Sequence, residues 1–127
     1  MAVNRGLNAR FGKMFRALVA STLSEHFPDA EARPVAARLS DAFADGVPAT
    51  DVVGVEGVTI HCRADAQASW SAALDMAENA ARFDGNDFGV LIEYRRGAGH
   101  DIADSYAVMT LEGWSRLARL ALVKEAA

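Results

Sequence analysis

The sequence contains little of what marks several common classes of protein. Its single cysteine, Cys62, excludes an internal disulfide framework and suits a reducing compartment. No apolar run approaches the roughly 20 residues that a membrane-spanning helix needs, and the N-terminal residues contain no apolar segment of the secretory type. Three prolines and the lack of Ser/Gly tracts exclude a disordered chain. We therefore expect a cytoplasmic protein with no membrane partner.

The composition that remains is typical of one globular domain over residues 1–127. Hydrophobic residues make up 51% of the chain and charged residues 24%. A chain of 127 residues lies near the commonest domain size. It is long enough to bury a core without disulfides or metals.

The charge is unevenly placed along the chain. The net charge is −4, which argues against a dedicated nucleic-acid binder. The first 16 residues nevertheless contain four bases and no acid, whereas residues 41–57 contain four acids and no base. The four bases are Arg5, Arg10, Lys13 and Arg16. They form either a nucleic-acid-binding face or an ordinary solvated helix face, and both interpretations remain open.

The hydrophobic pattern predicts strands interleaved with helices. Apolar residues at spacings of three and four predict a helix over 7–26, and Phe27 before Pro28 ends it. Further helices are predicted over 67–83, with a stripe of Trp70, Leu74, Ala77 and Ala81, and over 111–124 after a Thr110 cap. Residues 31–39 are either a strand or an amphipathic turn, and 40–50 read as loop.

Four strands accompany these helices. Residues 51–55 and 58–63 are β-branched runs separated by Glu56 and Gly57, which predicts a hairpin with a two-residue turn. Residues 88–94 predict a buried central strand, and 105–109 another strand after a Gly-rich loop over 95–104. The expected fold class is α/β, a mixed sheet flanked by helices.

The predicted hairpin carries the one arrangement of polar residues that suggests chemistry. Asp51 opens its first strand, and His61 and Arg63 lie on one face of the second because they are two residues apart. Cys62 and Ile60 then point toward the core. The three polar residues either converge on a site or form the solvated face of an edge hairpin. The sequence contains neither a phosphate-binding loop nor a cluster of zinc ligands.

Several segments resemble the PD-(D/E)xK nuclease superfamily over residues 6–120. They are GKMFR (12–16), DVVGVEGV (51–58), IHCR (60–63), Trp70, GVLIEYRRG (89–97) and DSYAVM (104–109). The chain is similar to small phage-encoded endonucleases related to archaeal-type Holliday-junction resolvases. The resemblance implies a restriction-endonuclease-like αβββαβ core, a homodimer, and a phage or prophage origin in a bacterial host.

The chain departs from the superfamily pattern at three of four positions. Asp51 matches the aspartate that holds Mg²⁺, but His61 stands at the second acid, Arg63 at the lysine and Arg16 at the helix glutamate. Mg²⁺ prefers oxygen ligands, and arginine keeps its positive charge at neutral pH. Asp51 and His61 therefore make a weak candidate metal pair, and we expect Asp51 to form an ion pair with Arg63 instead.

Three functions follow from the resemblance. The favoured one is a catalytically impaired nuclease-like protein that binds DNA or branched DNA as a dimer without a cofactor. Its DNA contacts are expected from Arg5, Arg10, Lys13, Arg16, Arg95 and Arg96. The alternatives are a protein-interaction module that inhibits a host factor, and an active Mg²⁺- or Mn²⁺-dependent endonuclease rescued by Glu93 or Glu56. Trp70 and Trp114 are expected in the core or in dimer contacts.

Overall fold

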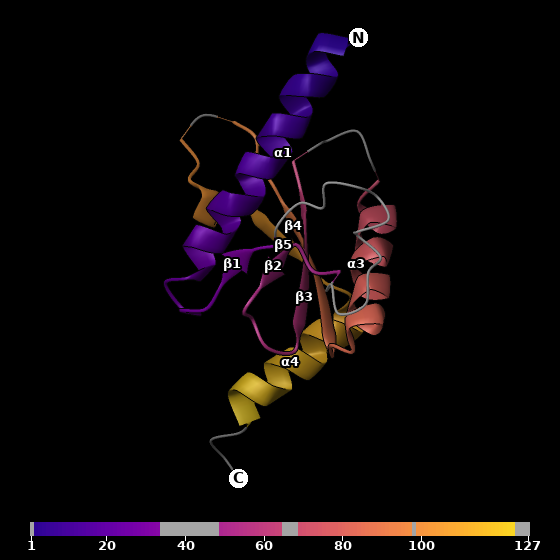
Figure 1. Cartoon of the computed structure of the whole chain (residues 1–127). Helices are drawn as coiled ribbons and strands as arrows, with labels where there is room; N and C mark the ends of the chain where they lie inside the picture. The colour runs from indigo at the N-terminus through magenta and orange to yellow at the C-terminus, as the bar shows by residue number, and fades with distance from the viewer. Residues whose placement is uncertain (1, 34–48, 65–68, 98, 124–127) are drawn as a thin grey trace.

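A computed structural model describes residues 2–33, 49–64, 69–97 and 99–123, except for the side chains of residues 2–10. These ranges form an α/β fold (Figure 1). Its elements in chain order are α1 (Ala2–Leu23), β1 (Glu31–Ala32), β2 (Val52–Val53), β3 (Val58–Arg63), α3 (Trp70–Asp84), β4 (Phe88–Glu93), a 3-10 turn η1 (Ile102–Asp104), β5 (Tyr106–Val108) and α4 (Leu111–Val123). No helix within these ranges is long and apolar enough to span a membrane.

The strands form a mixed sheet of order β3-β4-β5 and a separate antiparallel pair, β1-β2. β3 and β4 are parallel, and β4 and β5 are antiparallel. The predicted strands over 58–63, 88–94 and 105–109 and the α/β class are therefore confirmed, and β4 is the central strand as expected. The αβββαβ identity of the core stays a prediction.

Helices α1 and α3 pack against β3 through its alternating side chains. Ile60 is buried with Phe15 and Val19 of α1, and Cys62 packs against the same cluster. The opposite positions, Thr59 and Arg63, are buried on the other side of the strand, where the Thr59 hydroxyl bonds to Asp84 of α3. The predicted alternation along 58–63 is confirmed.

Helix α3 approaches the sheet through small residues. Its buried side chains are Ala73, Ala77 and Ala81. A Cβ on Gly89 of β4 would lie 2.7 Å from the Ala77 carbonyl oxygen, so the contact is close enough to require glycine there. The predicted stripe is confirmed at Ala77 and Ala81, and Leu74 is half-buried, but Trp70 is 48% exposed and the prediction is wrong there. Alanine, and not the largest apolar residue, marks the inward face.

The predicted two-residue hairpin over 51–63 is also wrong. β2 pairs with β1, and β3 has no strand on its outer edge within the described ranges. The chain between them turns through Gly54 and Gly57, which both have positive φ, and a Cβ on Gly54 would clash with the Asp29 carbonyl oxygen. The segment that opens with Asp51 nevertheless runs along β3, where the Asp51 amide donates to the Ile60 carbonyl.

The ends of the helices follow the sequence signals with small shifts. α1 begins at Ala2 and ends at Leu23, before the predicted 26, and Leu18 is partly exposed. The Thr110 hydroxyl accepts a hydrogen bond from the Gly113 amide (3.0 Å) and caps α4 as predicted. Of the uncertain segment 31–39, β1 shows a strand at its start, and residues 34–48 lie outside the described ranges.

Candidate functional site

The outer edge of β3 is completed by side chains in place of a neighbouring strand. The Ile60 amide donates to the Thr50 hydroxyl (2.9 Å), and the Cys62 amide donates to the Asp51 carboxylate (2.8 Å). The Asp51 amide in turn donates to the Ile60 carbonyl (2.7 Å). These bonds satisfy edge groups that are otherwise open to pairing with another chain, and they fix the Asp51 carboxylate beside His61.

Three basic side chains surround the Asp51 carboxylate. His61 Nδ1 lies 3.3 Å from one carboxylate oxygen, and Arg33 Nη2 and Arg16 Nη1 lie 3.5 and 4.0 Å from the other. We call Arg16, Arg33, His61 and Asp51 the basic cluster. Two guanidinium groups and one carboxylate give it a charge of +1 when His61 is neutral. The Asp51 side chain is only 11% exposed, whereas the three basic side chains reach solvent.

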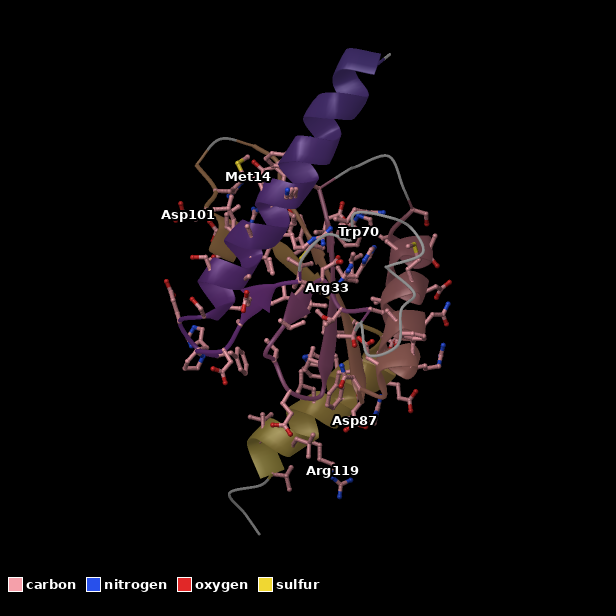
Figure 2. The ribbon with its side chains drawn as sticks, viewed as in Figure 1. Met14, Arg33, Trp70, Asp87, Asp101 and Arg119 are labelled. Atoms are coloured by element: carbon pink, nitrogen blue, oxygen red, sulfur yellow. The ribbon has the colours of Figure 1, made fainter. Side chains whose placement is uncertain are left out.

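Arg33 enters the cluster through the short β1-β2 pair. Its amide donates to the Asp51 carbonyl (2.9 Å), and its Nε donates to the Thr50 carbonyl (2.8 Å). Figure 2 shows Arg33 in the middle of the molecule, beside the strands. Nothing in the sequence pattern singled out this residue, because its position depends on a pairing between segments about 20 residues apart. It is the one cluster member that sequence reasoning missed.

Arg16 leaves part of its guanidinium group without a hydrogen bond. Its Nη1 atom is buried and has no hydrogen-bond partner among the described residues. Among the described residues the nearest acid is Asp51, at 4.0 Å. A buried donor of this kind favours an acceptor that enters the cluster.

The cluster holds Asp51 in its charged form. Burial alone raises the pKa of Asp51, but the hydrogen bonds from His61 and the Cys62 amide and the charges of Arg16 and His61 outweigh it. The pKa therefore lies below its ordinary value of 3.8. Burial and the nearby Asp51 charge raise the pKa of Cys62 to about 12, so its thiol stays protonated and unreactive.

The lowered pKa of Asp51 predicts a loss of stability in acid. A carboxylate with a depressed pKa stabilises the folded state above its unfolded pKa, and this contribution disappears as the pH falls through the lower folded value. At pH 6 we expect urea unfolding to give a higher free energy of unfolding for wild type than for Asp51→Asn. This difference should shrink as the pH falls below about 3.8. A gap that stays constant down to pH 2 would contradict this account of the cluster.

Arg63 pairs with Glu93 and not, as predicted, with Asp51. Its Nε and Nη2 atoms lie 2.8 and 2.6 Å from one Glu93 oxygen, and both side chains are less than a tenth exposed. Its Nη1 donates to the Ser69 carbonyl (3.0 Å). The parallel register sets Arg63 directly opposite Glu93 on one face of the sheet. The predicted Asp51–Arg63 ion pair is therefore wrong.

The donor set does not fit a Mg²⁺ ion. Asp51 supplies the one carboxylate of the cluster, and two guanidinium groups stand where further ligands belong. Glu93 is neutralised by Arg63, and Glu56 lies exposed in the turn before β3, at the other end of that strand from His61. Within the described ranges, no three acidic, histidine or cysteine residues are grouped so as to hold a metal ion.

The other predicted DNA-binding residues are spread over two regions. Lys13 is exposed on α1, and Arg5 and Arg10 lie in the same helix, but their side chains fall outside the described part. Arg96 is exposed and donates to the Ala64 carbonyl (2.6 Å), and the Arg95 guanidinium lies 5.5 Å from the centre of the Tyr106 ring. Only Arg16 of this set belongs to the basic cluster.

No protein-family model matches the chain, and no curated protein or solved structure matches it either. The function must therefore be argued from the residues themselves.

Proposed function

We propose that the protein binds the phosphate backbone of DNA, duplex or branched, through the basic cluster and does not cleave it. The observation that carries this proposal is the arrangement of Arg16, Arg33 and His61 around the single carboxylate of Asp51. Two fixed positive charges against one negative charge favour an anion over a metal ion. The resemblance to PD-(D/E)xK nucleases then concerns the scaffold and the position of the site.

Each member of the cluster has a physical role in this proposal. The guanidinium groups of Arg16 and Arg33 donate to phosphate oxygens with matched geometry and retained charge. His61 supplies a third nitrogen at the solvent-facing side. Asp51 positions the three basic side chains, and its own carboxylate is fixed by the hydrogen bond from the Cys62 amide. Arg63 contributes no proton transfer, since arginine cannot be deprotonated near neutral pH.

A mobility-shift experiment tests the proposal. The full chain is mixed with a four-way junction and with a duplex of equal length at low salt, where phosphate contacts are strongest. We expect a shift with both DNAs and unchanged DNA after prolonged incubation with Mg²⁺ or Mn²⁺. The absence of any shift would refute DNA binding, and cleavage would instead support the rearranged endonuclease. A phage- or prophage-encoded protein in the bacterial cytoplasm has direct access to such DNA.

We further propose that the protein acts as a homodimer that joins two copies through α4. Only Gly113 of this helix is buried. Arg116 attaches the helix to the rest of the fold, because it donates to the Asp87 carbonyl (3.1 Å) and covers the Phe88 ring. The other large apolar side chains of α4 are between 38% and 79% exposed. They are Leu111, Trp114, Leu117, Leu120, Leu122 and Val123. An exposed apolar surface of this size is typical of an interface.

The charges of α4 favour an antiparallel pair of identical helices. Leu111, Trp114, Ala118 and Leu122 follow one another at spacings of three and four and form the stripe. Glu112 and Arg119 lie on one flank of it, two turns apart. In an antiparallel pair the same flank of the two helices meets, which brings Glu112 of each copy near Arg119 of the other. In a parallel pair this flank faces the opposite flank of the partner, and the pairing of these two charges is lost. In Figure 2 Arg119 projects from α4 away from the rest of the fold.

Replacing two stripe residues tests this surface. We expect sedimentation to show a dimer for the wild type and a folded monomer for Leu111→Glu/Leu122→Glu, because buried unpaired carboxylates oppose association. Met76→Glu, at an exposed apolar residue of α3, is the control and should remain dimeric. A wild type that is monomeric at every concentration would contradict the dimer and favour the protein-interaction module.

A further inference from the structure

Two exposed aromatic rings meet at one end of the sheet. The ring centres of Trp70 and Tyr106 lie 5.7 Å apart at an interplanar angle of 46°. Trp70 is 48% exposed and Tyr106 is 42% exposed. The guanidinium group of Arg95 lies 5.5 Å from the centre of the Tyr106 ring. Soluble proteins usually bury such rings, so an exposed pair beside a cation needs an explanation.

Regular elements hold both rings in place. Tyr106 is the first residue of β5 and lies opposite Glu93 of β4. Trp70 begins α3, directly after Ser69, whose carbonyl accepts the hydrogen bond from Arg63. The buried Arg63–Glu93 pair therefore lies next to both aromatic residues. Arg63 belongs to β3 and follows His61 by two residues. Figure 2 shows Trp70 at the start of α3. The rings are preorganised and need no ordering upon binding.

The surroundings of the rings are cationic. Arg95 and Arg96 leave the end of β4 and make no ion pair with any residue in the described ranges. Arg96 is held near the end of β3 by its bond to the Ala64 carbonyl. Aromatic rings accept a stacked base regardless of its sequence, and neighbouring arginines attract the phosphates on either side of that base.

We propose that Trp70 and Tyr106 form a stacking platform for an unpaired nucleobase, with Arg95 and Arg96 holding the flanking phosphates. This proposal rests on the proposed DNA binding and names its substrate class. The preferred ligand is DNA that contains unpaired nucleotides, such as a single strand, a fork or an opened junction. Continuous duplex occupies the basic cluster alone, because its bases are stacked on one another and cannot reach the platform.

Fluorescence tests the platform directly. The Trp114→Phe variant leaves Trp70 as the only tryptophan and keeps an aromatic ring on α4. It is titrated at low salt with an oligothymidine single strand and with a duplex of equal length. We expect saturable quenching of Trp70 by the single strand and little quenching by the duplex. Quenching by neither DNA, although both bind in a mobility shift, would overturn the platform and leave the proposed DNA binding intact.

Affinities of variants supply the second measurement. Trp70→Leu and, separately, Tyr106→Leu should weaken single-strand binding by about 5- to 100-fold, the range measured for loss of one stacked base. Duplex binding should change less than twofold. Phe83→Leu, an exposed aromatic elsewhere on α3, is the control and should change neither. Equal losses for both DNAs, or no loss in either folded variant, would refute the platform. Failure of wild type to bind any DNA would refute the proposed function itself.

Discussion

Replacing Glu93 by leucine is expected to lower the free energy of unfolding by about 3–5 kcal/mol, the usual cost of removing one partner from a buried ion pair. Arg63 and Glu93 are 8% and 6% exposed, and Arg63 meets one Glu93 oxygen through two nitrogens. The substitution removes the carboxylate that meets two nitrogens of this buried guanidinium group. Denaturant unfolding at neutral pH measures the change.

The double variant Arg63→Met/Glu93→Leu distinguishes a structural pair from a functional one. Apolar side chains of similar volume often replace a buried ion pair with little loss of stability. We therefore expect the double variant to recover most of the stability lost in Glu93→Leu and to bind duplex DNA like the wild type. A double variant that is stable but no longer binds duplex DNA would show that Arg63 contacts the ligand, contrary to this account.

Replacing Arg16 and Arg33 together by glutamine is expected to weaken DNA binding at low salt at least about tenfold, because charge-assisted hydrogen bonds contribute about 1.5–3 kcal/mol each. The variant removes both fixed positive charges from the basic cluster and keeps side chains of similar length. Each phosphate contact also contributes close to one unit to the dependence of log K on log salt. We expect the salt slope to decrease by about 1–2 units.

Arg82→Gln/Arg119→Gln is the matched control for the loss of two charges. Both residues are exposed and belong to α3 and α4, outside the basic cluster. Because Arg119 is placed at the proposed dimer interface, all variants are compared at a concentration at which sedimentation shows this control to be dimeric. This control should keep at least half of the wild-type affinity and most of its salt slope. Equal weakening in the two double variants would indicate that binding follows net charge and not the cluster. Thermal unfolding of each variant confirms that the fold is retained.

Local sequence signals predicted the elements that carry strong patterns. The β-branched run of β3, the apolar run of β4 and the Thr110 cap of α4 each determine their own structure within a few residues. Asp51 and His61 were expected together, and they do lie together. The reason is different, because the Asp51 side chain takes the place of a strand at the edge of β3.

Features set by distant segments could not be read from the sequence. The parallel register that places Arg63 opposite Glu93 depends on α3, which connects the two strands in the chain and packs against both. Arg33 reaches Asp51 only through the β1-β2 pair. Trp70 lies on the same face of α3 as the buried alanines but is 48% exposed, because it is the first residue of the helix and meets Tyr106 at the end of the sheet. In each case tertiary packing decides between positions that local patterns leave equivalent.

The proposed function requires the basic cluster around Asp51 to bind an anion and not a metal ion. Nuclear magnetic resonance of the His61 imidazole tests it most directly, with His61→Asn used to assign the signal among the three histidines. The protein is titrated with inorganic phosphate and, separately, with Mg²⁺. We predict a saturable shift of the His61 resonances with phosphate that is lost in Arg16→Gln/Arg33→Gln, and no shift with Mg²⁺. A saturable response to Mg²⁺ with none to phosphate would contradict the account.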